Sequence, residues 1–149
     1  MTEVLFYHLE RQPLERVLPE LLEKCLDRGW RTVVQVGSEE RRDALDAHLW
    51  TYREDSFLPH GTAKDGSAAA QPIWITSAED NPNAATVRFV ADGAALPDLA
   101  AYARVVMLLD GNDPEAVEKA RGVWKDVKAG GHEATYWQQS ERGRWERKA

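Results

Sequence analysis

The sequence has few residues that could stabilise a fold through disulfides or bound metal. Cys25 is the only cysteine among 149 residues, so no disulfide can form within the chain. A lone thiol suits a reducing compartment, and we expect a cytoplasmic protein. The four histidines, at positions 8, 48, 60 and 132, lack the HxH or HxxxH spacing of a metal site. A chain of this length can bury enough apolar surface to fold as one domain without disulfides or metal.

Long apolar runs are missing as well. The longest, around residues 105–109, is far shorter than the roughly 20 residues that a helix needs to cross a bilayer. Residues 1–10 contain neither the basic start nor the apolar centre of a signal peptide. We therefore expect a soluble protein that does not associate with a membrane.

The glycines of a phosphate-binding loop are absent. Residues 7–13, at the first predicted strand-to-helix junction, contain no glycine, although a dinucleotide fold needs glycine there so that its backbone can approach pyrophosphate. The next junction has Gly37 and Ser38 but no Gly-Lys-Ser/Thr after them. Cys25 lies on the apolar side of a predicted helix, which favours a packed thiol over a nucleophile. We expect no cofactor and no intrinsic enzyme activity; a nucleotide or small-molecule enzyme on the same fold is the alternative.

Basic residues are too few for a direct nucleic-acid partner, because phosphate binding needs a concentrated cationic surface. The formal net charge is −6. Residues 1–103 hold 10 Lys/Arg and 17 Asp/Glu, whereas residues 104–149 hold 9 and 8. The last third of the chain is therefore the region most able to attract an acidic partner.

Strand and helix patterns alternate along the chain. Strands are predicted at residues 4–8, 32–36, 73–76, 86–90, 105–109 and 133–138. Helices are predicted from residue 14 to near Gly29, at 38–50 and at 113–128. This alternation predicts an α/β fold, a single three-layer sandwich with a largely parallel sheet. We expect one domain over residues 1–139 and a charged, frayed tail over 140–149.

The helix predicted at residues 113–128 has two distinct faces. An apolar stripe repeats at i, i+4, i+7 and i+11, and beside it a basic-aromatic set repeats at i, i+3, i+4 and i+7. The first set is Ala116, Ala120, Val123 and Val127, and the second is Arg121, Trp124, Lys125 and Lys128, with Val117 one turn before Arg121. Lysines near a helix C-terminus also stabilise its dipole, and Trp124 also fits the edge of a core. Spacing alone leaves a binding face and a structural face equally open.

Four motifs, taken in order, resemble the chi subunit of bacterial DNA polymerase III, a clamp-loader accessory subunit. They are FYHL at residues 6–9, DALDAHLW at 43–50, SFLPHG at 56–61 and ARxxWKxxKxG at 120–130. SFLPHG after a helix that ends in Leu-Trp is the most specific, and the resemblance extends to about residue 138. It implies a Rossmann-like, nucleotide-binding type of fold without the phosphate loop, which agrees with the missing glycines.

The resemblance also implies a function without catalysis. Chi-like proteins bind the acidic C-terminal tail of single-stranded-DNA-binding protein and link it to the clamp loader through the psi subunit. The family's tail site is a basic-aromatic helix, and Arg121, Trp124 and Lys125 match it, with Trp124 in place of the usual tyrosine; Val117 and Lys128 are added from spacing. The psi-facing positions are Trp50, Phe57, Leu58, Pro59 and His60, which could also form only a local apolar cluster. A pure assembly subunit, whose single partner docks at Trp50 and Phe57, is a further alternative.

Overall fold

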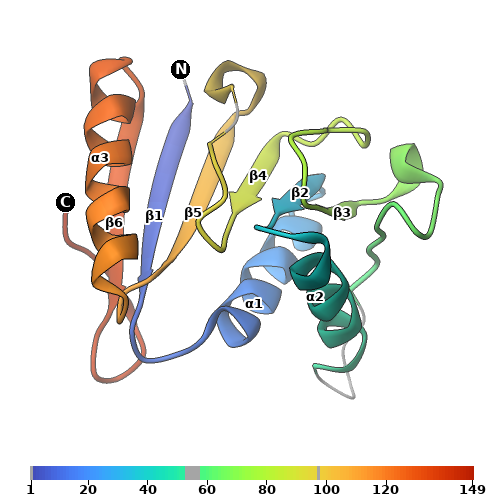
Figure 1. Cartoon of the computed structure of the whole chain (residues 1–149), viewed down its shortest axis with the longest axis horizontal. Helices are drawn as coiled ribbons and strands as arrows, with labels where there is room; N and C mark the ends of the chain where they lie inside the picture. The colour runs from blue at the N-terminus through green and yellow to red at the C-terminus, as the bar shows by residue number, and fades with distance from the viewer. Residues whose placement is uncertain (1, 53–57, 97) are drawn as a thin grey trace.

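One seven-stranded sheet forms the centre of the described chain (Figure 1). The computed structural model describes residues 2–52, 58–96 and 98–149. The strands lie in the order β3-β2-β4-β5-β1-β6-β7; each pair is parallel except β6 and β7, which are antiparallel. Their bounds are β1 Glu3–Leu9, β2 Thr32–Gln35, β3 Ile73–Thr76, β4 Val87–Val90, β5 Arg104–Asp110, β6 Glu133–Gln139 and β7 Trp145–Arg147.

The helices begin and end at local signals in the sequence. They are α1 Leu14–Asp27, α2 Glu39–Thr51 and α3 Pro114–Ala129, with short 3-10 turns η1 Ala68–Ala70 and η2 Leu99–Ala101. Ser38 caps α2 by accepting a hydrogen bond from the Arg41 backbone N–H at 3.2 Å. Asp113 caps α3, and Pro114 occupies the first turn, where its missing N–H costs nothing.

Helices cover both faces of the sheet, which makes the three layers that the sequence predicts. Residues from α1 and α2 pack on one face with Val34, Phe89 and Val106. Residues from α3 pack on the opposite face with Val4 and Phe6. In Figure 1, α3 lies by β1 and β6, whereas α1 and α2 lie toward β2 and β3. The predicted α/β fold class is confirmed.

The segment after β6 differs from the frayed tail that the sequence predicts. Residues 140–144 form a tight turn, in which the Ser140 N–H donates to the Arg144 carbonyl at 2.7 Å and Gly143 adopts a φ of +79°. Strand β7 then pairs with β6, and the Trp145 ring packs edge-on against Tyr7 at 4.7 Å. The expectation of fraying was wrong for residues 145–147 because Trp145 contacts a residue 138 positions earlier, which local composition does not reveal.

Strands β1 and β5 are neighbours whose connections leave in opposite directions. The chain after β1 crosses to β2 through α1 on one face, whereas the chain after β5 crosses to β6 through α3 on the other. Such a switch point opens a crevice at the carboxyl ends of the strands.

In the part of the chain that the structure describes, no helix combines the length and apolar character required to span a bilayer. Nor do three or more His, Cys, Asp or Glu side chains gather there as a possible metal site.

Candidate functional site

The basic-aromatic side of α3 lies at the molecular surface. Arg121, Lys125 and Lys128 are exposed, whereas Val117 and Trp124 are half-buried against the core. We call these five residues the α3 surface. The stripe beside it faces inward, with Ala120 and Val127 buried. The two faces inferred from spacing are therefore both present, but Trp124 belongs partly to each.

Trp124 is held by aromatic contacts from two strands. Its ring meets the ring of Phe6, in β1, edge-on with centroids 5.3 Å apart, and that of Tyr136, in β6, at 6.2 Å. The Lys128 ammonium lies 5.3 Å from the centroid of the indole. The indole is thus fixed on its inner side by the core and bordered on its outer side by a cation.

The cations of the α3 surface have few competing partners. Arg121 pairs with Glu118 at 3.5 Å, and both side chains are more than two-thirds exposed, so this pair contributes little to stability. Among the described residues, Lys125 and Lys128 form no ion pair. The positive charge of this surface therefore remains available to an acidic ligand.

Three side chains near Arg121 are linked by hydrogen bonds, and their sequence pattern did not predict this link. The Tyr136 hydroxyl bonds to Nδ1 of His8 at 2.5 Å, and Nε2 of His8 meets a Glu10 carboxylate oxygen at 2.6 Å. Burial raises the pKa of Tyr136, although the positive charge of Arg121 acts in the opposite direction. The FYHL motif contains Phe6, which packs beneath Trp124, and His8, which bonds to Tyr136, so this motif forms much of the layer under the α3 surface.

Gly111 is required for this arrangement. A Cβ at Gly111 would stand 2.2 Å from Nε2 of His8, which is closer than any side-chain contact allows. The loop between β5 and α3 therefore approaches His8 through a glycine.

The second predicted surface surrounds the end of α2. Trp50 is the exposed large hydrophobic residue of the described chain, with 49% of its area accessible. Its ring lies 4.3 Å from that of His60, which is buried and bonds through Nδ1 to the Leu58 carbonyl oxygen at 2.6 Å. Leu58 is also buried and Pro59 is half-buried. Phe57 lies outside the described residues. Trp50 can contact a partner directly, whereas the buried His60 ring supports it and is itself bonded to the Leu58 backbone.

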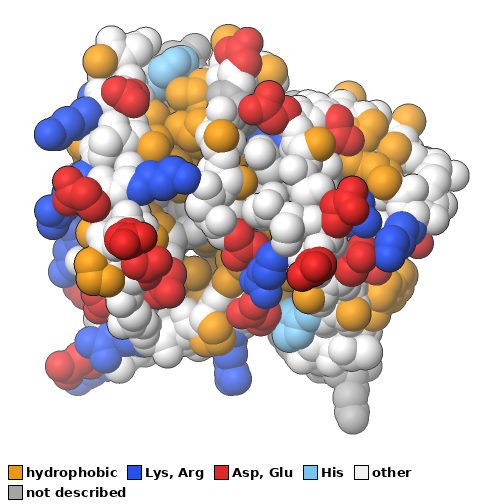
Figure 2. Space-filling model, viewed as in Figure 1, with side chains coloured by type: hydrophobic (Ala, Val, Ile, Leu, Met, Phe, Trp, Pro, Cys, Tyr) orange, Lys and Arg blue, Asp and Glu red, His pale blue; other side chains and the backbone are white. Residues whose placement is uncertain are grey.

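A large cleft lies in the crevice at the switch point between β1 and β5, with a volume of ≈ 1270 Å³. Figure 2 shows the surface hollowed between α3, at the left, and the middle of the molecule. Six acidic residues line the cleft against three cations: Glu10, Glu15, Asp92, Asp110, Asp113 and Glu115 against Arg11, Arg41 and Lys119. Arg41 is held by Glu15 at 3.1 Å and by Asp92 at 3.0 Å. This charge balance disfavours phosphate groups.

Comparison with known proteins shows which family the chain belongs to. The family model described as DNA polymerase III chi subunit, HolC, matches residues 1–135. The chain belongs to the DNA polymerase III chi subunit family.

Two curated chi-family proteins show the same relationship. The probable DNA polymerase III subunit chi of Rickettsia prowazekii is 33% identical over 87 residues, which cover 58% of this chain and 53% of the relative. The DNA polymerase III subunit chi of Pseudomonas aeruginosa is 31% identical over 78 residues, which cover 50% of this chain and 55% of the relative. The chain thus spans about half the length of the curated relatives it matches.

The chi family match covers both candidate surfaces. It includes α2, α3 and the chain between them, and it stops within β6, one residue before Tyr136. The resemblance inferred from the four motifs is therefore confirmed, whereas the roles of individual surface residues are proposals.

Proposed function

We propose that this chi-family chain is a non-catalytic accessory subunit of DNA polymerase III, and that its α3 surface binds the acidic C-terminal tail of single-stranded-DNA-binding protein. One observation carries the proposal: three exposed cations share α3 with a half-buried indole, and one of them, Lys128, borders its ring, in a chain whose net charge is −6. A disordered acidic tail with an apolar end matches both features of this surface.

Charge and apolar contact have different roles in this mechanism. Arg121, Lys125 and Lys128 attract the carboxylates of the tail, and a guanidinium or ammonium meets the terminal carboxylate. Exposed ion pairs contribute only about 0.2–1 kcal/mol each, so charge mainly speeds and orients the encounter. The apolar end of the tail packs against Trp124 and Val117, and this contact supplies much of the affinity.

The fixed position of Trp124 favours such a contact. An indole already packed against Phe6 and Tyr136 loses little conformational freedom when a ligand covers its remaining surface. Because the tail binds to protein and not to DNA, the subunit would hold the polymerase assembly on coated single strands without contacting the DNA itself.

Binding of a synthetic tail tests the proposal. A peptide of about ten residues with several aspartates and a C-terminal Pro-Phe should bind, and Arg121→Ala should weaken binding by about 1–3 kcal/mol, the range for a lost charge-assisted hydrogen bond. Arg121 is exposed and pairs only with Glu118 among the described residues, so the variant should remain folded. Isothermal calorimetry gives the affinity and circular dichroism checks the fold.

Two controls separate specific capture from general attraction. Arg16→Ala removes the same charge from an exposed position on α1 and should leave the affinity unchanged. Amidating the peptide's terminal carboxylate should weaken binding to the unmodified protein. Equal binding by wild type, Arg121→Ala and Arg16→Ala would show that α3 presents only a solvated helix face.

We also propose that the surface at Trp50 links the subunit to the clamp loader through the psi subunit. An exposed tryptophan supported by buried side chains is a frequent anchor of protein interfaces. If Trp50 is this anchor, the two surfaces can be occupied together, since α2 and α3 cover opposite faces of the sheet.

Trp50→Ala should therefore weaken psi binding by about 2 kcal/mol or more, the usual loss at an interface anchor. Binding of the acidic peptide should stay within twofold of wild type. The adjacent Thr51→Ala, also at an exposed position, is the matched control and should bind psi normally. Co-purification with psi, followed by calorimetry, measures both. A folded Trp50→Ala protein that retains full psi affinity would contradict this assignment.

A further inference from the structure

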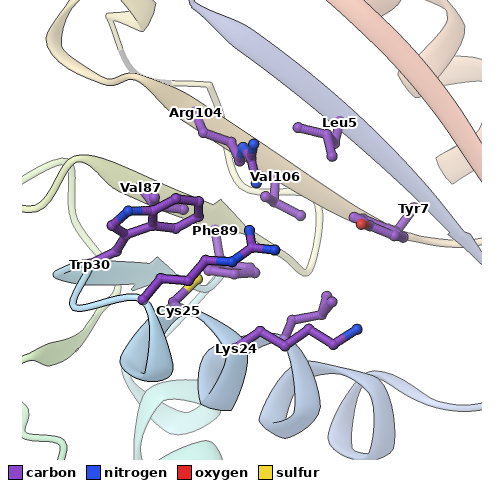
Figure 3. A pocket seen from close by; sticks show the side chains of 11 residues that line it. Leu5, Tyr7, Lys24, Cys25, Trp30, Val87, Phe89, Arg104 and Val106 are labelled. Atoms are coloured by element: carbon purple, nitrogen blue, oxygen red, sulfur yellow. The ribbon is translucent and has the colours of Figure 1, made fainter.

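A second, smaller hollow lies between α1 and the sheet, where β4 and β5 begin (Figure 3). Its volume is ≈ 220 Å³. Buried apolar side chains form its floor, contributed by Leu5, Val87, Phe89 and Val106. Trp30, Lys24 and Arg28 stand closer to solvent. The hollow thus has an apolar interior and a polar rim.

Cations gather at this rim around one indole. The guanidinium carbon of Arg28 lies 4.9 Å from the centroid of the Trp30 ring, and that of Arg104 lies 5.1 Å from it. Lys24 also lines the hollow, and none of the lining residues is acidic. The one carboxylate paired with these cations in the described chain is that of Glu3, 3.4 Å from Arg104. Three positive charges therefore border a hollow in a protein of net charge −6.

Helix stability explains only part of this cluster. Lys24 and Arg28 lie at the C-terminal end of α1, where cations stabilise the helix dipole. Arg104 is the first residue of β5, so the dipole of α1 does not explain its position. Its field also reaches the interior: burial raises the pKa of the Cys25 thiol and of Tyr7, and the charge of Arg104 opposes the rise at both.

We propose that this hollow binds a carboxylate attached to a small apolar or aromatic group. A guanidinium that stacks on an indole uses its face, so its in-plane N–H groups can still donate to a carboxylate. The apolar group of the ligand would occupy the space above Phe89 and Val106. At ≈ 220 Å³ the hollow is smaller than pockets for drug-sized molecules, which are roughly 300–1,000 Å³, and suits a single ring or branched chain.

The ligand can be a free acid or the terminal residue of a peptide, since both offer the same chemistry. Either way, the site is distinct from the α3 surface. Leu5 and Tyr7 face α1, whereas Phe6, between them in β1, faces α3 on the other side of the sheet. Failure at one site therefore leaves the other unaffected.

Phenylacetate is a suitable probe, with the neutral phenylacetamide as its matched partner. We expect phenylacetate to bind with a dissociation constant on the order of a millimolar, as befits about ten non-hydrogen atoms. Binding should shift the indole N–H resonance of Trp30 in NMR spectra. Arg104→Gln and Arg28→Gln should each weaken it about tenfold, the loss expected for one charge-assisted hydrogen bond. Arg16→Gln, on the same helix, should leave it unchanged.

The sole thiol gives a second readout, because a bound probe should slow alkylation of Cys25 in the hollow. A peptide ending in phenylalanine distinguishes the two sources of the ligand. If it shifts the Trp30 indole resonance and competes with phenylacetate, the ligand is a peptide terminus. If it shifts only the Trp124 indole resonance, the hollow binds free acids. Equal binding of phenylacetate and phenylacetamide would overturn the proposal. So would unchanged binding by Arg28→Gln, whose exposed position keeps that variant folded even if Arg104→Gln is unstable.

Discussion

Replacing Arg88 by Met should lower the free energy of unfolding by about 2–5 kcal/mol, because buried acceptors would lose their donor. Arg88 lies in β4 and none of its surface is accessible to water. Its guanidinium donates twice to the Gln35 side-chain oxygen, at 2.8 and 3.0 Å, and once to the Tyr102 hydroxyl at 2.9 Å. It also donates to the carbonyl oxygens of Ala78 and Asp80. Urea unfolding measures the change.

A double variant tests whether the stability is lost because a buried acceptor is left without its donor. Changing Gln35 to Leu together with Arg88→Met removes an acceptor along with its donor, so part of the stability should return. Arg16→Met, at an exposed position on α1, should change stability by less than about 0.5 kcal/mol. An Arg88→Met protein as stable as wild type would show that water or the relaxed chain satisfies the orphaned acceptors.

Phe6→Ala should lower the free energy of unfolding by about 3–5 kcal/mol, the usual cost of emptying a buried aromatic site. Phe6 is fully buried in β1, and its ring is stacked with that of Tyr136 at 6.3 Å and edge-on to that of Trp124 at 5.3 Å. The cavity would lie directly beneath the α3 surface. Chemical denaturation, monitored by circular dichroism, gives the magnitude.

The same substitution connects the core to the proposed binding site. Without Phe6 the indole of Trp124 loses one of its two aromatic supports, so the acidic peptide should bind several-fold more weakly to the folded variant. Phe6→Leu fills most of the cavity and should lose less stability and less affinity. If the folded Phe6→Ala protein binds the peptide like wild type, Trp124 does not depend on its packing for function.

The layout of elements could be predicted from the sequence because its signals are local. Ser38 and Asp113 cap the helices that follow them, and the strand predicted at residues 73–76 has those bounds in the structure. Each signal lies within a few residues of the boundary that it marks. The parallel sheet then follows from the alternation of strands and helices.

The environment of Trp124 could not be predicted from spacing. Its helical position places it between the buried stripe and the exposed cations, and either neighbour could have determined its burial. The deciding contacts come from Phe6 and Tyr136, which are aligned with each other by the pairing of β1 with β6. Because those strands are far apart in sequence, the aromatic base of the α3 surface depends on tertiary register.

The same limit applies to the hollow beneath α1. Trp30 and Arg104 are 74 positions apart, and they meet only because α1 returns the chain to the sheet beside the start of β5. Arg88 is a further example, since a charged residue within a strand pattern is ordinarily exposed. Its complete burial depends on Gln35 and Tyr102, which no local pattern identifies.

Strand β7 also changes how the protein meets other copies of itself. Without it, β6 would present the unpaired backbone groups of a seven-residue edge that includes Tyr136 and Trp137, a template for strand addition and aggregation. The hairpin occupies that edge from Trp137 to Gln139. The backbone N–H of Lys148 extends the pairing by donating to the Tyr136 carbonyl oxygen at 2.7 Å. The new edge is three residues long and bears the charges of Glu146 and Arg147. A short edge offers few backbone groups for strand addition, and its charged side chains would lose water on pairing, so this hairpin should limit self-association at high concentration.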